Sequence, residues 1–377
     1  MKLPTLSTLN VRNKRVLIRL DLNTEIIKGK AQFSARMKAH LITLKELKKK
    51  KAKTIILAHQ SRPGKPDFTS LKQHAKLLKV KFVPDILGKK AVSAITSLKP
   101  GQVLLLENIR SIKDEFNQSL KNNDLINILA PLFDIYLNDA FSVSHRSQTS
   151  VTGFPQVLKS GIGRVLESEL KHLQKIKVKN ALFILGGAKP KENIDILKKN
   201  KNVITTGIFG QLCTIAKGHN LGAQNKFLKD KVKEFVPKLK PLVKNIQTPI
   251  DFAVRVEGNK RKEIPLEDFP SKYEIFDIGK KTQALCIKKI KQAKYIFMKG
   301  VAGYCEDLKF CQGTHAIFKA ITKSKAFSLV GGGHTTDAIQ KLKINKSRFG
   351  YISLSGGALD EYIAGKKLPG IEALKKK

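Results

Sequence analysis

Short apolar runs rich in β-branched residues recur along this chain, and longer lysine-rich segments separate them. The runs read "RVLIRLDLN", "TIILAHQ", "QVLLLEN", "IYLNDAF", "ALFILGG", "NVITTGI", "AKYIFMKG", "FSLVGGG" and "YISLSGG". The segments between them are long enough for helices, as in "MKAHLITLKELKKK" and "THAIFKAITK". Apolar strands that alternate with helices are typical of parallel sheets covered on both faces. Because 377 residues exceed the size at which one core usually stops growing, we expect an α/β fold with two doubly wound, Rossmann-like domains.

The residues that follow these strands differ between the two halves of the chain, and in such sheets the binding crevice lies beyond the carboxyl ends of the strands. The early strands are followed by polar side chains, namely Asp21, Asn23, His59, Arg62, Asn108, Arg110, Asn138, Asp139, His145 and Arg146. The late strands are followed by glycines, namely Gly186, Gly187, Gly207, Gly210, Gly300, Gly303, Gly331, Gly332, Gly333, Gly356 and Gly357. Of the 26 glycines 21 lie at or after residue 161, whereas 8 of the 11 arginines lie within the first 164 residues.

This contrast predicts two kinds of anion site. Arginines at strand ends can hold a carboxylate or phosphate through two parallel hydrogen bonds. Glycines between a strand and a helix let backbone N–H groups approach phosphate oxygens. We expect a small phosphorylated acid on the first half and a nucleotide on the second, although such residues also serve as ordinary turn and ion-pair positions. The chain has no Walker A, dehydrogenase or protein-kinase signature, and its histidines lack the spacing of a metal hydrolase.

The composition favours a cytoplasmic protein. No apolar run approaches the ~18 residues that a membrane span needs, and the opening "MKLPTLSTLN" lacks the apolar region of a secretory signal. The four cysteines, Cys213, Cys286, Cys305 and Cys311, show neither C-x-x-C spacing nor nearby histidine pairs. We expect them to be reduced thiols rather than parts of a disulfide framework or a zinc site.

The formal net charge of +42 is the extreme feature of the composition. Neutralising nucleic-acid phosphates requires basic residues, so the charge raises the question of a nucleic-acid partner. However, 61 of the 72 basic residues are lysines, and they spread along the whole chain. Lysine is a solvated point charge, whereas arginine is the residue that reads phosphates and base edges. We therefore favour a generally lysine-rich surface, whose field attracts anionic substrates.

Taken in order, the strand-end loops resemble those of the phosphoglycerate kinase family. The matching stretches read "RLDLN", "LAHQSRPG", "LLLENIR", "LNDAFSVSHR", "LGGAK", "GVAGYCE", "LVGGGHTT" and "SLSGGALDEYIAGKKLPGIEAL". Each stretch is weak evidence alone, but eight in the right order over most of the chain form a specific pattern. The stretches "AHQSRPGKPDFTSLKQHA" and "GGGHT" resemble the corresponding sequences of archaeal members of the family.

The resemblance implies two doubly wound α/β domains joined by a hinge helix, with a C-terminal tail that folds back onto the first domain. We place a phosphoglycerate-binding domain at residues 1–165 plus a tail of about 362–377, and a nucleotide-binding domain at 166–361. The hinge falls in "GRVLESELKHLQKIKVKN", residues 163–180.

The resemblance also implies reversible phosphoryl transfer between the acyl phosphate of 1,3-bisphosphoglycerate and ADP, which yields 3-phosphoglycerate and ATP with Mg²⁺ as cofactor. The glycerate and its non-transferring phosphate would be held by Asp21, Asn23, Arg36, His59, Arg62, Arg110 and Arg146. Arg36, in "SARMKAH", would also reach the migrating phosphoryl group. Since the implied partners are small molecules, we expect a monomer without membrane attachment that acts in glycolysis or gluconeogenesis.

On the nucleotide side, Lys189 matches the family lysine that accompanies the phosphoryl group, and Glu306 matches the acid that bonds the ribose. Gly356 and Gly357 open the helix whose N-terminus faces the transferred phosphate in the family. The remaining nucleotide contacts would come from Gly186, Gly187, Ala188, Gly207, Gly300, Gly331, Gly332, Gly333, His334 and Thr335.

At three motif positions this sequence differs from the residues that are more common in the family. In the family a second lysine follows the lysine of "GGAK" by four residues, and here Asn193 occupies that position. Lys191, two residues earlier, could substitute for the missing lysine. Lys299 stands where the family has a neutral amide near the phosphates. His334 replaces an aspartate that ligates the nucleotide-bound Mg²⁺, and it is a poor direct replacement because Mg²⁺ prefers oxygen. Three arrangements stay open: His334 touches phosphate or metal-bound water, Asp337 serves as the ligand, or the nucleotide and water hold the metal.

The competing function is a catalytically weakened kinase scaffold that binds RNA or another polyanion through its basic surface. The net charge and the departures on the nucleotide side favour it. The substrate-side Asp, Asn, His and Arg residues favour an active kinase, because a pure RNA binder would not need them. Filter binding across a salt titration separates the two, since a polyanion binder shows a steep salt dependence without turnover.

Arg36→Ala and Lys189→Ala should each lower kcat by ~10²-fold or more, the scale of a lost transition-state contact. A loose phosphoryl transition state needs positioning and positive charge rather than covalent help from the protein. The measurement is steady-state turnover of the two purified variants beside the parent protein. Near-normal kcat in both variants would contradict these assignments.

Overall fold

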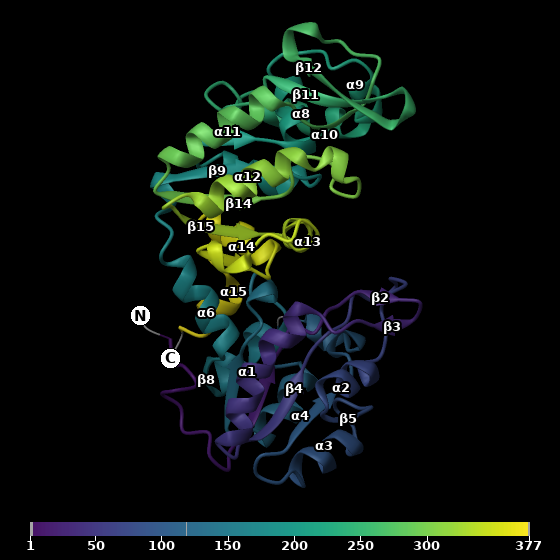
Figure 1. The fold of residues 1–377 in the computed structure, drawn as a ribbon. Coiled ribbons are helices and arrows are strands. Elements are labelled where there is room, and N and C mark those ends of the chain that lie inside the picture. The colour runs from purple at the N-terminus through teal and green to yellow at the C-terminus, as the bar shows by residue number, and fades with distance from the viewer. Residues whose placement is uncertain (1–2, 118, 376–377) are drawn as a thin grey trace. The chain divides into compact units, whose positions relative to one another are not determined.

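The computed structural model describes residues 3–117 and 119–375, which form two compact units. The N-terminal unit comprises the described residues up to Lys171 together with those from Lys367 onward, and the C-terminal unit is His172–Lys366. The boundary between the units lies inside the segment 163–180, and the tail that returns to the N-terminal unit begins at Lys367. Each unit contains a parallel sheet with helices packed beside it (Figure 1), so the predicted α/β class is confirmed.

The N-terminal unit is built on a six-stranded, fully parallel sheet in the order β5-β6-β4-β1-β7-β8. Its strands are β1 (Arg15–Arg19), β4 (Lys53–Leu57), β5 (Lys81–Val83), β6 (Val103–Leu106), β7 (Ile135–Asn138) and β8 (Lys159–Ile162). A separate antiparallel pair consists of β2 (Ile26–Ile27) and β3 (Lys30–Ala31). The central strands are buried along almost their whole length, as expected for a sheet covered on both faces.

Local signals in the sequence explain where the main helices of this unit begin. Helix α1 (Ala35–Lys49) begins where the Ser34 hydroxyl accepts a hydrogen bond from the Met37 N–H. Helix α6 (Arg164–Leu173) begins where the Asp139 carboxylate accepts hydrogen bonds from the N–H groups of Val165 and Leu166. The shorter helices are α2 (Lys72–Leu78), α3 (Lys89–Thr96), α4 (Asp124–Leu129), α5 (Phe154–Val157) and α15 (Pro369–Ala373). The tail that carries α15 is tied to the unit by the Gly370 N–H, which donates to the Ser144 carbonyl at 2.8 Å.

The C-terminal unit is built on a five-stranded parallel sheet in the order β10-β9-β14-β15-β16. Its strands are β9 (Ala181–Leu185), β10 (Val203–Thr205), β14 (Tyr295–Lys299), β15 (Phe327–Gly331) and β16 (Tyr351–Ser353). A second, antiparallel sheet, which the sequence pattern did not predict, contains β11 (Asp251–Val256), β12 (Lys260–Pro265) and β13 (Ile275–Ile278). Strand β12, "KRKEIP", is charged and partly exposed, so it lacks the kind of apolar run by which nine of the strands were predicted.

The helices of the C-terminal unit follow its strands as a doubly wound topology requires. They are α7 (Pro190–Leu197), α8 (Gly207–Ala216), α9 (Ala223–Phe227), α10 (Lys229–Leu239), α11 (Lys280–Gln292), α12 (Gln312–Lys323), α13 (Gly333–Lys341) and α14 (Gly357–Ile363). Helices α11 and α12 lie side by side (Figure 1) and share a core with strands β9, β14 and β15. No helix in the described part of the chain is long and apolar enough to cross a membrane.

The prediction that all four cysteines are reduced thiols is wrong for two of them. Cys305 and Cys311 form a disulfide with their Cα atoms 4.5 Å apart, whereas Cys213 and Cys286 are free and buried. The loop after β14 turns back on itself between Cys305 and Cys311, which brings together two cysteines whose spacing is not a recognised pairing signal.

Candidate active site

The N-terminal unit gathers the predicted substrate residues at one edge of its sheet. Arg19, the last residue of β1, pairs with Leu57 at the end of β4 and with Asn138 at the end of β7. Because these strands run in the same direction and end together, the loops that follow them emerge at the same edge. Those loops carry Asp21, Asn23, His59, Arg62, Arg110 and Arg146, while Arg36 lies in the first turn of α1.

Asp21 is a buried carboxylate at this edge. Its Oδ2 lies 3.1 Å from Nη1 of Arg36 and also accepts a hydrogen bond from the Ser142 hydroxyl, and its Oδ1 accepts from the Asn23 N–H. Burial raises the pKa of Asp21, but the charge of Arg36 and these hydrogen bonds outweigh it and hold the pKa well below its usual range. Asn23 in turn accepts a hydrogen bond from the Ser61 N–H at 2.6 Å, which ties the loop after β1 to the loop after β4.

Arg19 belongs to this site, although the sequence pattern did not identify it. Its side chain is fully buried, and its Nη2 lies 3.1 Å from Nδ1 of His59. A guanidinium can only donate hydrogen bonds, so Nδ1 of His59 accepts and the ring proton resides on Nε2. Burial and the Arg19 charge hold the pKa of His59 well below its ordinary value. His59 therefore offers a neutral N–H donor to an anion.

A short chain of hydrogen bonds holds Arg19 in place. Its Nε donates to the Ser150 hydroxyl at 2.8 Å, and that hydroxyl donates to Oε1 of Glu115 at 2.8 Å. The Ser150 N–H also donates to the Glu115 carboxylate. Glu115 is fully buried, and burial raises its pKa. The only sequence signal for Arg19 is that an otherwise apolar run ends in an arginine, as "RVLIR" does.

The arginines of this edge repel one another. Burial lowers the pKa of Arg110 to about 9, and the charges of Arg19 and Arg146 lower it further. Burial and the nearby charges of Arg62 and Arg19 likewise lower the pKa of Arg146. Arg110 donates to the Ser61 carbonyl at 2.5 Å, while its buried Nε has no hydrogen-bond partner among the described residues. Mutually destabilised cations with an unused donor constitute a site for an anion.

Other strand-end residues that the sequence pattern singled out support the loops instead. The Asn108 amide donates to the carbonyls of Gln60 and Thr69. Asp139, also fully buried, bonds the Thr43 hydroxyl and Nδ1 of His40 in addition to the start of α6. These contacts use the polar atoms internally, so we assign Asn108 and Asp139 to structure rather than to ligand binding.

His74 stabilises the loop after β4 through a contact with Gln60. Its Nε2 lies 3.1 Å from Oε1 of Gln60, which also accepts from the Thr24 N–H, and the Gln60 amide donates to the Thr24 and Asp67 carbonyls. His74 is fully buried and its Nδ1 has no partner among the described residues. Burial therefore lowers the pKa of His74 to about 4.

The C-terminal unit presents the predicted glycine loops at the carboxyl ends of β9, β10, β14, β15 and β16. The Gly186 N–H donates to the Lys299 carbonyl at 2.7 Å, and the Gly187 N–H donates to the Val301 carbonyl at 2.9 Å. At Gly300, where φ is +81°, an added Cβ would lie 2.3 Å from the Gly186 backbone. A side chain at Gly300 would thus break the contact between these two loops, which explains why glycine is required there.

The other predicted nucleotide residues divide into buried and exposed groups. Thr335 is buried, and its hydroxyl accepts a hydrogen bond from the Gly300 N–H at 2.9 Å. Lys189, the N-cap residue of α7, is exposed. The other exposed or half-buried predicted residues are Gly187, Ala188, Gly300, Glu306, Gly332, Gly333, His334, Gly356 and Gly357. An added Cβ at Gly333 or Gly356 would meet nothing within 4 Å, so both positions leave open space for a ligand.

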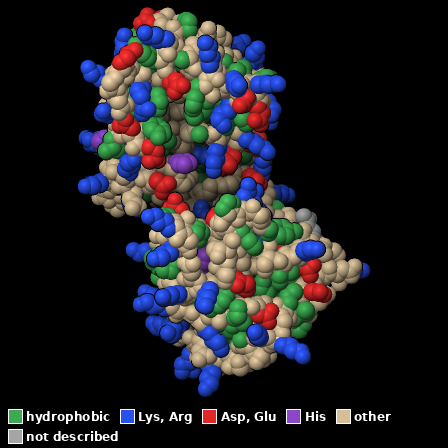
Figure 2. Space-filling model, turned by 90° about the vertical axis from the view of Figure 1, so that its right-hand side faces the viewer, with side chains coloured by type: hydrophobic (Ala, Val, Ile, Leu, Met, Phe, Trp, Pro, Cys, Tyr) green, Lys and Arg blue, Asp and Glu red, His purple; other side chains and the backbone are tan. Residues whose placement is uncertain are grey.

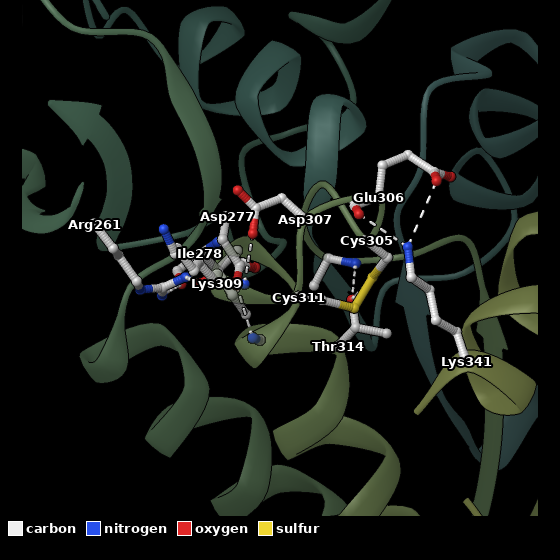
Figure 3. The surroundings of a disulfide bond; sticks show 12 residues. Arg261, Asp277, Ile278, Cys305, Glu306, Asp307, Lys309, Cys311, Thr314 and Lys341 are labelled. Carbon is white, nitrogen blue, oxygen red and sulfur yellow. Dashed lines mark hydrogen bonds and ion pairs between the residues drawn. A yellow bond between two sulfur atoms is a disulfide. The ribbon is translucent and has the colours of Figure 1, made fainter. Parts of the chain in front are cut away.

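Glu306 lies on a separate loop that the disulfide closes (Figure 3). Its carboxylate lies 3.6 Å from Nζ of Lys341, and the same amine donates to the Glu306 carbonyl at 2.9 Å. Thr314 braces the loop from inside, since its hydroxyl accepts from the Ala302 N–H and lies 3.5 Å from Sγ of Cys305. Glu306 itself is exposed.

The two residues considered as possible metal ligands, His334 and Asp337, are not part of a group of ligands around one point among the described residues. The described part of the chain contains no cluster of three or more His, Cys, Asp or Glu side chains suited to a metal ion. His334 and Asp337 are both exposed on α13. A hard cation such as Mg²⁺ needs about six oxygen ligands, so these residues do not fit a resident metal site.

Comparison with known proteins identifies the family. The family model for "Phosphoglycerate kinase" matches residues 6–366. A phosphoglycerate kinase of Sulfolobus acidocaldarius is 37% identical over 399 residues, covering 99% of this chain and 95% of the relative. One of Methanosarcina mazei is 39% identical over 402 residues, covering 98% of this chain and 94% of the relative.

Solved structures agree with the sequence comparison. The crystal structure of phosphoglycerate kinase from Pyrococcus horikoshii OT3 superimposes with a TM-score of 0.89 at 33% identity and covers 98% of both chains. The structure of phosphoglycerate kinase from Coxiella burnetii gives a TM-score of 0.83 at 31% identity, covering 100% of this chain and 99% of the other. The resemblance inferred from the strand-end motifs is thereby confirmed.

His74→Gln should remove part of the acid sensitivity of this protein. Unfolded histidine takes up a proton near pH 6.5 whereas folded His74 does so only near 4, so the stability that neutral His74 contributes is lost as pH falls through 6.5. Between pH 7.5 and 5.5 this loss amounts to about 1 kcal/mol. Urea unfolding of both proteins at the two pH values measures it. An equal loss of stability in parent and variant would contradict this account of His74.

Proposed function

The chain belongs to the phosphoglycerate kinase family, and on this premise we propose which of its residues carry the reaction. The protein is a phosphotransferase with a carboxyl group as acceptor. It transfers the acyl phosphate of 1,3-bisphosphoglycerate reversibly to ADP, giving 3-phosphoglycerate and ATP in glycolysis. The proposals below concern the roles of individual residues, the metal and the setting in which the protein works.

We assign 3-phosphoglycerate to the carboxyl edge of the N-terminal unit, and the mutually repelling arginines are the observation that carries this assignment. A phosphate placed among Arg62, Arg110 and Arg146 would relieve their repulsion and satisfy the unused Nε of Arg110. The Nε2–H of His59, held in that tautomer by Arg19, would donate to the bound anion. Asp21 would accept a hydrogen bond from the single hydroxyl group of the glycerate, and the side-chain amide of Asn23 would donate to the same hydroxyl oxygen.

We assign the nucleotide to the glycine loops of the C-terminal unit. The nucleotide would lie against the loops that contain Gly186, Gly187, Gly207, Gly300, Gly331, Gly332 and Gly333, with Ala188, His334 and Thr335 beside them. Glu306 would bond the ribose from the loop that the disulfide closes.

Phosphoryl transfer itself would rest on positive charge rather than on covalent chemistry. Arg36, one third exposed, would exchange its contact with Asp21 for the migrating phosphoryl group. Lys189 would accompany that group from donor to acceptor, and the N–H groups at Gly356 and Gly357 would face it. The donor and acceptor would bind to separate domains, so closure of the domains would align them and exclude water.

We propose that Mg²⁺ arrives as part of the nucleotide. The described residues present no metal cage, whereas nucleotide phosphates and water supply the oxygens that Mg²⁺ prefers. We further propose a cytoplasmic monomer, because its substrates are small and diffusible and each anion site is built within one unit of this chain.

Binding of RNA or another polyanion is the second candidate function, and it receives no support from the family comparison. On the face shown in Figure 2, lysine and arginine side chains are scattered among acidic and neutral ones rather than gathered in one stripe. Such a distribution favours a general lysine-rich surface.

The test of the reaction is ATP turnover with 3-phosphoglycerate and Mg²⁺, followed through a coupled dehydrogenase. We expect turnover in the usual range of kinases, roughly 1–100 s⁻¹. No rate above background at high enzyme concentration, together with tight and salt-sensitive RNA binding, would instead support the polyanion-binding scaffold.

His334→Ala and Asp337→Ala should leave the Mg²⁺ dependence of turnover unchanged. The physical reason is that both side chains are exposed and stand outside any cluster of ligands in the described residues. Titration of Mg²⁺ at fixed ATP, with parent protein as control, gives the half-saturating concentration. A shift of about tenfold in either variant, the effect of removing one supporting ligand, would assign the metal to that residue.

A further inference from the structure

The disulfide Cys305–Cys311 lies in the loop that joins β14 to α12, and this loop carries part of the proposed nucleotide site (Figure 3). Glu306, which is assigned to the ribose, stands between the two cysteines and is exposed. The start of the same loop is bound to a glycine loop, because the Ala302 carbonyl accepts the Gly207 N–H at 3.1 Å. A covalent bond that thiol chemistry can open and close therefore lies inside the nucleotide-binding loop.

The two cysteines differ in their exposure. Cys305 is half-buried and lies between the exposed residues Tyr304 and Glu306, whereas Cys311 is fully buried. A disulfide is opened by a thiolate that attacks one of its sulfur atoms, and the site of attack depends on access. The sulfur of Cys305 is therefore the one that an external thiol can reach.

Noncovalent contacts would keep both ends of the loop in place after the disulfide opens. The Tyr304 N–H donates to the Phe276 carbonyl at 2.7 Å. Phe310, which is fully buried, packs against the Phe276 ring with the ring centroids 5.1 Å apart. Reduction should therefore change the segment between Tyr304 and Phe310 and leave the rest of the unit folded.

Opening the bond must move one of the two cysteines. Two thiols in van der Waals contact lie further apart than two bonded sulfur atoms, so one of them has to be displaced. Cys311 is the N-cap residue of α12 and is fully buried, which fixes its position. The cysteine that moves is therefore Cys305, whose neighbour in the chain is Glu306.

Glu306 has few other constraints on its position. Its carboxylate lies 3.6 Å from Nζ of Lys341, an exposed side chain that also donates to the Glu306 carbonyl at 2.9 Å. The next residue, Asp307, lies 3.8 Å from Nη2 of Arg255. Both ion pairs are long and partly exposed, and such pairs restrict a loop weakly. The disulfide is thus the strongest constraint on where the Glu306 carboxylate lies.

We propose that Cys305 and Cys311 form a redox switch on nucleotide binding. The disulfide holds Glu306 in place for the ribose, and reduction to two thiols weakens the binding of MgATP. The inference rests on the proposed nucleotide site. It also agrees with the proposed cytoplasmic setting, because a disulfide in a cytoplasmic protein is usually transient.

The reductant of this switch would be a dithiol. Its thiolate attacks Sγ of Cys305, the S–S bond breaks, and Sγ of Cys311 leaves as a thiolate that takes up a proton. The second thiol of the reductant then attacks the mixed disulfide and releases Cys305 as a thiol. The protein gains two electrons and two protons, and the reductant becomes a disulfide.

Isothermal titration calorimetry of the oxidised full chain, and of the same protein reduced by excess dithiothreitol, tests the switch. Reduction should raise the Kd for MgATP about fivefold or more, the scale of a coupling between two sites, and reoxidation should restore it. The Kd for 3-phosphoglycerate should stay within about twofold, since that site lies in the other unit. Alkylation of free thiols followed by mass spectrometry reports the state of the bond in each sample.

Three variants separate the switch from other effects of the reductant. Cys305→Ser combined with Cys311→Ser should bind MgATP like the reduced parent, with or without dithiothreitol. Cys213→Ala combined with Cys286→Ala is the matched control, because it removes the two free cysteines and should keep the full response. Glu306→Ala should lose the response, because the disulfide acts through that carboxylate.

A disulfide that native protein retains in excess dithiothreitol would overturn the proposal, and so would an equal Kd for MgATP in the oxidised and reduced parent. A response that persists in Glu306→Ala would also overturn it. If the double serine variant does not fold, the comparison of oxidised with reduced parent decides alone. Turnover of the oxidised parent tests the proposed function separately, since an active enzyme whose MgATP affinity ignores the disulfide would lose only this inference.

Discussion

Parallel strand pairing is the constraint on which the rest of this structure depends. Strands buried on both faces leave no room for polar chemistry along their length, so ligands can be met only where the strands end. In the main sheet of each unit the strands run in the same direction, and their carboxyl ends therefore share one edge. Loops that are separated by dozens of residues in the chain thus become neighbours, as the hydrogen bond between Asn23 and Ser61 illustrates.

The two units place different chemical groups at the carboxyl ends of their strands. The N-terminal unit brings several guanidinium groups together at one edge. Two of them are stabilised by hydrogen bonds and ion pairs within the unit: Arg19 donates to Ser150, which in turn donates to Glu115, and Arg36 pairs with Asp21. The C-terminal unit offers backbone, with bulk excluded by glycine at close approaches such as that of Gly300 to Gly186. Its buried charges include Asp251 and Asp277 as well as the pair of Lys299 and Asp360, which places an amine beside the glycine loops. Side-chain forks suit a small anion of fixed shape, whereas backbone suits a string of phosphates.

Much of the fold could be predicted because its signals are local. All nine apolar runs correspond to strands, and helices such as α1 and α12 fall where mixed segments of sufficient length predicted them. The strand-end motifs were also visible, since a motif is read from consecutive residues. The antiparallel sheet of the C-terminal unit escaped prediction because β12 is charged and partly exposed, so its pairing with β11 rather than its composition makes it a strand. The Cys305–Cys311 disulfide escaped because it depends on a turn that the spacing does not announce.

The sequence by itself determined the α/β class, the positions of nine strands along the chain and the identity of the residues that follow them. Only the tertiary structure decided what those residues contact: that Arg19 selects the tautomer of His59, that Asp139 starts a helix, and that Lys299 is shared between Glu192 and Asp360. The physical reason is that a motif records which group is present, whereas its charge state and its availability to a ligand depend on burial and on partners brought from distant parts of the chain. Lys299 and Glu192, 107 positions apart, acquire their meaning only when the sheet sets them 2.5 Å from each other.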